Sequence, residues 1–196
     1  MPAQPPDFVA LSRDVLARHV PRRIERPEAM PAAVLVPLIH HGGSDRVILT
    51  VRSYDVEHHK GQISFPGGAV HAADADLATT ALRETWEEIG VRPEDVEVLG
   101  QLDDIVTISN FVVAPFVGVV RGGPYEFVPN PLEVAEVIEP PIAHLLDPAN
   151  LVWEERSGVD TVVRSPAYLY EGHRIWGATA RMLHGFLTLL AAAQPA

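Results

Sequence analysis

The sequence predicts an α+β fold in which helices pack against a sheet within a single main domain. Two segments repeat apolar residues at the spacing of an α-helix, and several short runs rich in valine, isoleucine and leucine are typical of strands. These strands and helices do not follow one another in regular β-α-β order, which is the pattern of doubly wound parallel sheets. The chain of 196 residues has the length of one ordinary domain with small additions.

The first 30 residues are expected to form a short helix and a linker ahead of the main domain, which we place at residues 31–194. Apolar residues near the start recur at helical spacing: Phe8, Val9, Leu11, Val15 and Leu16. Prolines and charged residues then alternate between Pro21 and Pro31, a composition that is typical of linkers.

The main domain is expected to open with two strands, at 33–39 and 46–52, which the turn His41-Gly42-Gly43-Ser44 separates. A shorter strand at 62–65 ends at Pro66-Gly67-Gly68. Further strands are predicted at 96–106, at 111–120 and within 152–170, and further helices at 141–146 and 177–193.

The clearest helix is predicted at 76–89. Its core stripe consists of Ala78, Leu82, Thr85 and Ile89. Asp74 or Asp76 can cap its first turn, and Gly90 stands where a glycine commonly ends a helix.

Composition excludes several classes of function. A formal net charge of −11 argues against a broad basic surface for nucleic acid, and it repels anionic ligands unless a cation or a basic pocket intervenes. The absence of cysteine excludes disulfides, thiolate nucleophiles and cysteine zinc sites. No signal peptide is visible, and the longest apolar stretch, 111–120, is far shorter than the roughly 20 residues of a membrane helix. We therefore expect a soluble, cytoplasmic protein without a membrane partner.

Three glutamates lie close together on the helix predicted at 76–89. Glu84, Glu87 and Glu88 fall within an arc of about 100° of the helical wheel, beside the core stripe. Like charges at this spacing repel each other, and Arg83 can relieve the repulsion through a contact with Glu87 four residues on. A hard divalent cation would relieve it more fully, because Mg²⁺ binds carboxylate and phosphate oxygens. Glutamate-rich helix faces are, however, usually just solvated.

The residues around this helix favour the metal interpretation. Gly61-Gln62-Ile63-Ser64-Phe65-Pro66-Gly67-Gly68 precedes the helix, and Arg83-Glu84-Thr85-Trp86-Glu87-Glu88-Ile89-Gly90-Val91 lies within and after it. This combination resembles the signature of the Nudix hydrolases, whose second half the latter run matches, with Thr85 in place of the usual aliphatic residue. The first half departs: the interval from Gly68 to Arg83 is one residue longer, and the expected first glutamate falls on Ala75, between Asp74 and Asp76.

The longer interval resembles the coenzyme A pyrophosphatase branch of that family. That branch carries a preceding motif to which the run from Val56 to Gly68, VEHHKGQISFPGG, is similar, although Val56 and Glu57 replace its usual Leu-Arg pair. LDDIVT at 102–107, NPLEV at 130–134 and IWGATARML at 175–183 also resemble the branch. Together the resemblance covers most of residues 33–190 and implies an α/β/α sandwich with a mixed sheet.

The resemblance implies metal-assisted chemistry on a diphosphate. Glu84, Glu87, Glu88 and the backbone carbonyl of Gly68 would hold Mg²⁺, with Mn²⁺ as a substitute, and the catalytic set would be Glu84, Arg83 and Glu88, with Arg83 orienting a glutamate. The general base stays open between a glutamate of the signature and a later acid: Asp103, Asp104, Glu133 or Glu136. Candidate phosphate contacts near the glycine turn are Arg52, His59, Lys60 and Gln62, although basic residues at strand ends also often face solvent.

The expected reaction is hydrolysis of coenzyme A or an acyl derivative to 3′,5′-ADP and 4′-phosphopantetheine-type products. One alternative is a Nudix activity on ADP-ribose, dinucleoside polyphosphates or oxidised nucleoside triphosphates. The other is a non-catalytic module that senses a nucleotide or binds a partner. The apolar C-terminal helix and the strand edges could also support a homodimer.

Overall fold

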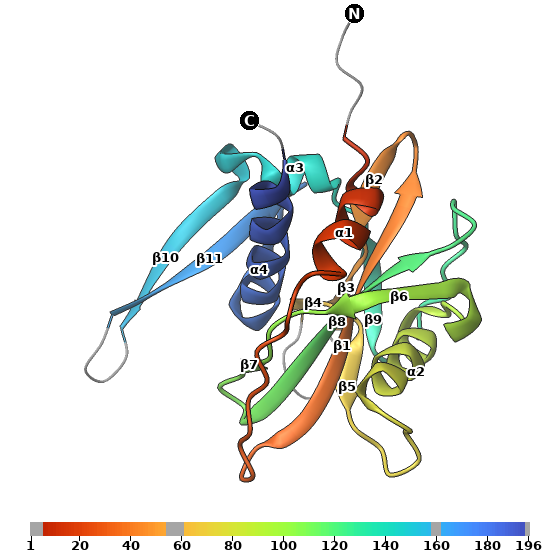
Figure 1. The fold of residues 1–196 in the computed structure, drawn as a ribbon, viewed down its shortest axis with the longest axis vertical. Helices are drawn as coiled ribbons and strands as arrows, with labels where there is room; N and C mark the ends of the chain where they lie inside the picture. The colour runs from red at the N-terminus through yellow and green to blue at the C-terminus, as the bar shows by residue number, and fades with distance from the viewer. Residues whose placement is uncertain (1–5, 54–60, 158–161, 195–196) are drawn as a thin grey trace, which may run out of the picture.

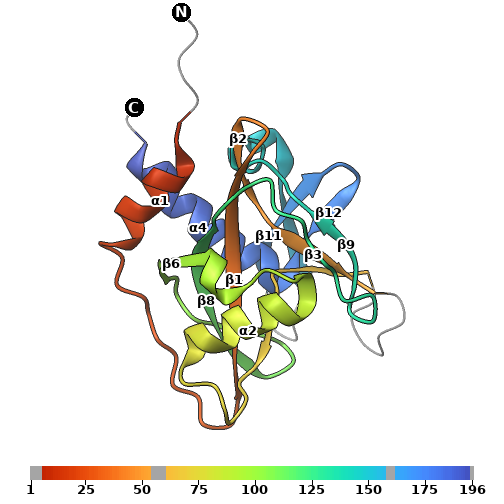
Figure 2. The same cartoon turned by 90° about the vertical axis from the view of Figure 1, so that its right-hand side faces the viewer.

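The computed structural model describes residues 6–53, 61–157 and 162–194. A mixed sheet is built on β1 (Met30–His41), which pairs in parallel with β8 (Phe111–Val120) and antiparallel with β2 (Ser44–Val47). β6 (Val96–Gln101) and β7 (Ile105–Val106) pair with β8, and β5 (Gly67–Ala69) pairs with β1. Helix α2 (Leu77–Ile89) lies on one side of this sheet, and α1 (Phe8–Leu16) and α4 (Gly177–Ala193) lie on the other (Figures 1 and 2). The predicted α/β/α sandwich with a mixed sheet is confirmed.

Strand β1 divides the core because its side chains alternate between the two faces of the sheet. Val36 and Leu38 belong to the larger core, together with apolar residues of α1 and α4. Ala33 and Leu35 pack instead against Ala81 of α2. The run is apolar on both faces, as expected for a strand that is covered on both sides.

The run 46–52, predicted as one strand, is divided between two sheets. Residues up to Val47 pair with β1, whereas β3 (Leu49–Arg52) pairs with β4 (Ile63–Ser64) and with β9 (Val134–Ile138). The break lies at Ile48, whose backbone N–H donates to Pro37 O at 2.9 Å. This second sheet brings the end of β3 and the start of β9 towards α2, where Glu84, Glu87 and Glu88 lie.

The predicted strand 96–106 is likewise broken, into β6 and β7. Leu102, Asp103 and Asp104 form the interruption, and their polar groups hold the segment that follows α1. Asp104 Oδ2 accepts a hydrogen bond from Ile24 N at 2.9 Å, and Asp103 Oδ1 accepts one from Arg22 N at 3.0 Å. The two aspartates therefore attach the N-terminal segment to the sheet.

Helix α1 is also attached at its start. The buried carboxylate of Asp45, on β2, accepts hydrogen bonds from Phe8 N at 2.7 Å and Val9 N at 3.2 Å. Phe8 and Leu16 are buried in the larger core. The predicted helix near the start of the chain is thus present and packs on the α4 side of the sheet.

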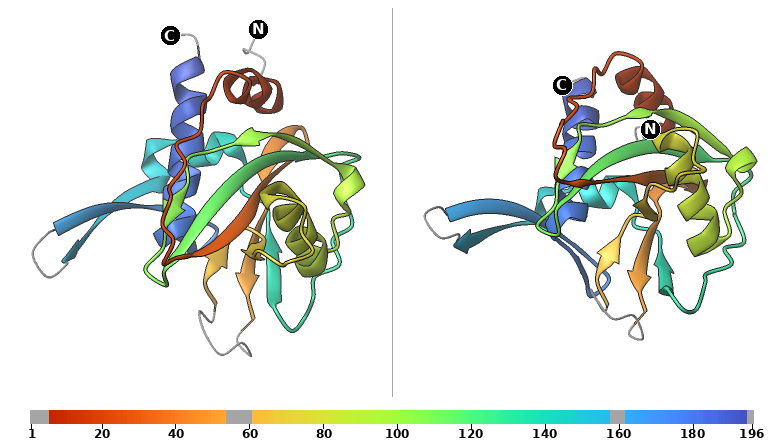
Figure 3. Two further views of the ribbon diagram at one scale, coloured as in Figure 1. Left: turned by 60° about the horizontal axis from the view of Figure 1, so that its bottom comes forward. Right: turned by 90° about the horizontal axis from the view of Figure 1, so that it is seen from below.

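Of the remaining elements, α3 (Ile142–Leu146), β10 (Leu151–Ser157) and β11 (Val162–Tyr170) were expected, apart from small shifts of boundary. The 3-10 turns Pro93–Asp95 and Pro148–Asn150 and the strand β12 (His173–Ile175) were not predicted. β10 and β11 form a hairpin that projects from the body of the molecule (Figure 3). Among the described residues, no helix is both long and apolar enough to cross a membrane.

Candidate active site

Helix α2 has the boundaries that its sequence indicates. Asp76 caps the first turn, where its side chain accepts from Thr79 N at 2.7 Å and from Thr79 Oγ1 at 2.8 Å. Gly90 ends the helix in the left-handed conformation, with φ of 74°. Of the predicted core stripe, Thr85 and Ile89 are fully buried, whereas Ala78 and Leu82 are only partly buried. The buried face also contains Thr80, Ala81 and Glu88, so it is rotated from the predicted one.

Glu88 is the most deeply buried of the three glutamates, with an exposed fraction of 4%. Its Oε1 lies 3.5 Å from the backbone nitrogen of Gly67, at the turn that precedes β5. Burial raises the pKa of Glu88 to about 8, and nearby Arg52 opposes this effect only in part. A carboxylate held there without a strong partner is a suitable oxygen ligand for a cation.

Glu84 faces the same glycine turn. A Cβ added to Gly68 would come within 2.6 Å of the carboxylate of Glu84, so a larger residue there would force that carboxylate to shift. Burial raises the pKa of Glu84 as well, and its hydrogen bond from Arg83 opposes the rise. The buried carboxylate of Glu88 and the partly buried carboxylate of Glu84 therefore both face the backbone of Gly67 and Gly68.

Arg83 joins the helix to the loop before it. Its guanidinium donates to Glu84 Oε1 at 2.8 Å, to Glu87 Oε2 at 2.9 Å and to Ala69 O at 3.2 Å. The predicted contact between Arg83 and Glu87 is confirmed. Two further hydrogen bonds, at 2.9 and 3.1 Å, reach both carboxylate oxygens of Asp74. Such a bidentate pair fixes the orientation of the guanidinium.

Asp74 is a site residue that the sequence reasoning did not assign. The signature expects a glutamate at the position of Ala75, but it is the neighbouring Asp74 that binds Arg83. Asp74 Oδ2 also accepts from His71 N at 2.9 Å and from Thr80 Oγ1 at 2.8 Å. The signal in the sequence was the interval from Gly68 to Arg83, which is one residue longer than in the signature. The acid that pairs with Arg83 is accordingly Asp74, one position before Ala75, and Asp76 caps the helix.

Replacing Asp74 with asparagine is expected to destabilise the protein in a pH-dependent way. The hydrogen bonds from Arg83 hold the pKa of Asp74 well below its usual range. The ionised form therefore stabilises the fold above the unfolded-state pKa of about 3.9, and this contribution disappears as the pH falls through the lower folded-state pKa. Denaturant unfolding of Asp74→Asn should show a deficit at pH 7 that shrinks at pH 3.

The matched control for this prediction is Asp14→Asn, which changes an exposed aspartate of α1. It should leave the free energy of unfolding nearly unchanged at both pH values. An Asp74→Asn deficit that is the same at pH 7 and pH 3 would show that the ion pair with Arg83 is not its cause.

Glu87 does not join the two buried glutamates. Its side chain is 46% exposed and is held by Arg83. Within residues 6–53, 61–157 and 162–194, no three His, Asp or Glu side chains come together in an arrangement that could hold a metal ion. The physical reason is that Arg83 holds Glu87 by a hydrogen bond, so that of the three glutamates only Glu84 and Glu88 face Gly67 and Gly68.

Two of the four predicted substrate contacts, Arg52 and Gln62, lie within the described residues. Arg52 ends β3, and its charge acts on Glu88, which places it across the site from α2. Its Nε is buried without a hydrogen-bond partner among the described residues. Gln62 lies opposite Arg52, and its backbone carbonyl accepts a hydrogen bond from Arg52 N at 2.9 Å. His59 and Lys60 lie outside the described residues.

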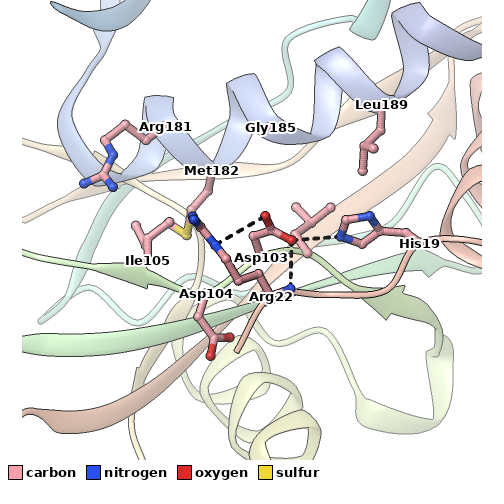
Figure 4. A pocket seen from close by; sticks show the side chains of 10 residues that line it. His19, Arg22, Asp103, Asp104, Ile105, Arg181, Met182, Gly185 and Leu189 are labelled. Atoms are coloured by element: carbon pink, nitrogen blue, oxygen red, sulfur yellow. Dashed lines mark hydrogen bonds and ion pairs between the residues drawn. The ribbon is translucent and has the colours of Figure 1, made fainter. Parts of the chain in front are cut away.

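The structure separates the four acids that were candidates for the general base. Asp103 lies between His19 and Arg22, with its Oδ1 3.1 Å from His19 Nε2, in a pocket beside α4 (Figure 4). Asp104 also lines that pocket, which is on the face of the sheet opposite to α2. Both aspartates therefore hold the N-terminal segment through hydrogen bonds to its backbone.

Glu136 and Glu133 have different neighbours at β9 (Val134–Ile138). Glu136 pairs in register with Val51, a residue of the larger core, and its carboxylate is 3.6 Å from His173. Glu133 precedes β9, and its charge contributes to the raised pKa of Glu88. Of the four acids, Glu133 is thus the one whose charge helps to raise the pKa of a glutamate of α2.

Comparison with known proteins identifies the family. The NUDIX domain family matches residues 29–155. This chain belongs to the Nudix hydrolases. Members of this family act on small nucleotide substrates with divalent metal ions.

Relatives and solved structures agree with this assignment. The chain is 39% identical to mitochondrial coenzyme A diphosphatase NUDT8 of Mus musculus, covering 91% of this chain and 86% of that protein. It is 38% identical to the human NUDT8, covering 91% and 76%, and 38% identical to the uncharacterized Nudix hydrolase NudL of Pectobacterium atrosepticum, covering 78% and 79%.

Two solved structures share the fold. A MutT/nudix family protein from Enterococcus faecalis superposes with a TM-score of 0.56 at 17% identity, covering 97% of this chain and 70% of that one. The Nudix hydrolase RenU from M. smegmatis gives a TM-score of 0.54 at 17% identity, covering 86% and 89%. At this identity the likeness concerns the fold alone.

Proposed function

We propose that this Nudix hydrolase cleaves the diphosphate of coenzyme A or of an acyl derivative. The products would be 3′,5′-ADP and 4′-phosphopantetheine or its acylated form. The observation that carries the proposal is the pair of carboxylates at Gly67 and Gly68, the buried Glu88 and the partly buried Glu84, with the arginine Arg52 across from them. For the substrate, the support is the name of the mouse and human relatives, which are coenzyme A diphosphatases similar to this chain over 91% of its length.

The residues at the turn fit a hard divalent cation. Glu84, Glu87, Glu88 and the carbonyl of Gly68 are all oxygen donors, the class that Mg²⁺ prefers, and Mn²⁺ could replace it. When bound, the cation would neutralise phosphate charge and lower the pKa of a bound water. The buried carboxyl of Glu88 and the space left by Gly68 are the observations of fit. Glu87 would become a ligand of the cation once its side chain rotated away from Arg83.

The side chains of the protein orient the reacting groups. Arg83, fixed by Asp74, holds the carboxylate of Glu84 in place through the hydrogen bond at 2.8 Å. The partly buried guanidinium of Arg52 is placed to donate to a phosphate oxygen, because its Nε has no partner in the described part of the chain. Gln62, next to Arg52 across the β3–β4 pair, would contact the same group. His59 and Lys60 remain predicted contacts.

A substrate panel tests the proposal. The purified protein would be incubated with Mg²⁺ and, separately, coenzyme A, acetyl-coenzyme A, ADP-ribose, a dinucleoside tetraphosphate and an oxidised nucleoside triphosphate. We expect the coenzyme A substrates to have the highest kcat/KM, with 3′,5′-ADP identified by mass. Chelation of the metal should abolish the reaction, and Mg²⁺ should restore it. Cleavage of ADP-ribose without cleavage of coenzyme A would overturn the substrate assignment.

A further inference from the structure

One asparagine connects the loop before β9 to the carboxylate helix. Asn130 N donates to the backbone carbonyl of Glu88 at 2.8 Å, near the end of α2. The side chain of the same residue donates from Nδ2 to Glu133 Oε1 at 3.1 Å and accepts from Leu132 N at 3.1 Å. Its carbonyl also accepts from Glu133 N at 3.0 Å. Asn130 therefore determines how Glu133 lies relative to Glu88.

Glu133 is held from a second direction by the strand that carries Arg52. Its backbone carbonyl accepts from Ser53 N at 2.8 Å, directly after β3. Arg52 is itself paired with Val134, the residue that follows Glu133. The loop thus stands between the predicted phosphate-binding arginine and the buried glutamate of α2.

We propose that Glu133 is a further catalytic residue of this site, which accepts a hydrogen bond from the attacking water, and that Asn130 is the positioning residue that orients it. In the hydrolysis, the water oxygen forms a new bond to phosphorus and the bridging P–O bond breaks, leaving its electron pair on the departing phosphate. The protons of the water pass to phosphate oxygens or to solvent. The inference rests on the proposed diphosphate hydrolysis at this site, but not on the identity of the nucleotide.

The test is a double-mutant cycle on Asn130 and Glu133. Glu133→Gln should lower kcat by about 10²-fold with KM changed less than threefold, because a misplaced water raises the barrier without weakening substrate binding. Asn130→Ala should have a similar effect. The double variant should be no slower than Glu133→Gln alone, since the asparagine acts through the glutamate. Each rate would be measured on whichever nucleotide the wild-type protein cleaves, so failure with coenzyme A alone would overturn only the substrate assignment.

Asn130→Asp separates orientation from loop structure. Aspartate keeps the oxygen that accepts from Leu132 N but loses the donor to Glu133 and brings a like charge to it. We expect Asn130→Asp to lose as much kcat as Asn130→Ala. Recovery of wild-type kcat in Asn130→Asp would show that the asparagine only shapes the turn, and would overturn the proposal.

Two controls give readouts other than turnover. Glu136→Gln changes an acid of β9, the strand that follows Glu133, whose side chain lies near His173, and it should leave kcat within about twofold of wild type. Calorimetric titration with Mg²⁺, without nucleotide, should show similar affinity for wild type, Asn130→Ala and Glu133→Gln. A loss of Mg²⁺ affinity in Asn130→Ala would mean that the residue acts through α2, and a Glu133→Gln rate equal to that of Glu136→Gln would exclude Glu133; either result overturns the proposal.

Discussion

Glu88→Gln is expected to lower kcat by about 10²–10³-fold and to leave the protein as stable as the wild type or more so. The substitution keeps the shape of the side chain and removes the charge that would bind a cation. Burial already raises the pKa of Glu88 to about 8, so the metal-free fold gains nothing from this acid. Steady-state kinetics and thermal unfolding of the same samples would measure both effects.

The control for Glu88→Gln is Glu94→Gln, the same chemical change at an exposed residue just beyond α2. It should alter neither kcat nor the midpoint of thermal unfolding. Calorimetric titration should show Mg²⁺ binding to Glu94→Gln and much weaker binding to Glu88→Gln. Near-normal turnover and Mg²⁺ affinity in Glu88→Gln would remove this residue from the proposed metal site and favour a nucleotide-sensing role for the module.

Gly67→Ala is expected to destabilise the fold by roughly 2–4 kcal/mol, the largest effect on stability that we predict. Gly67 has φ of 157°, and a Cβ there would lie 2.4 Å from Ala33 O and 2.6 Å from Val34 Cα. These are backbone atoms of the central strand, so β5 would have to separate from β1. Denaturant unfolding followed by circular dichroism would measure the loss.

Gly185→Ala is the matched comparison for this substitution. Gly185 lies within α4, and a Cβ there would meet nothing within 4 Å. Alanine should therefore stabilise the helix by about 0.5–1 kcal/mol, because it has less conformational freedom to lose on folding. If Gly67→Ala were as stable as wild type, β5 could not be packed against β1 as closely as the structure shows.

The parts of the fold that could be predicted depend on neighbours in sequence. Helix α2 was expected at 76–89 and runs from Leu77 to Ile89, because its cap, its core stripe and its final glycine act within one or two turns. β8 and α4 were likewise expected at 111–120 and 177–193, where the structure has them. The contact between Arg83 and Glu87 needs only the helical repeat.

Where contacts join distant residues, the sequence left the outcome open. The run 46–52 has the pattern of one continuous strand, and only pairing with β1 on one side and β9 on the other divides it at Ile48. The pair of Asp74 and Arg83 depends on how the loop before α2 folds back, which spacing alone indicated only as a departure from the signature. Candidate acids that were equivalent in sequence, such as Asp103 and Glu133, lie at separate places in the fold.

Residues close together in sequence were enough to predict the helix that carries the glutamates, and its motifs were enough to indicate the family. The burial of Glu88 and the place of Glu133 beside the site became clear only from the packing of distant segments. The reason is physical: helical periodicity and capping act over a few residues, whereas burial and charge pairing depend on which strands of the two sheets come to lie beside α2.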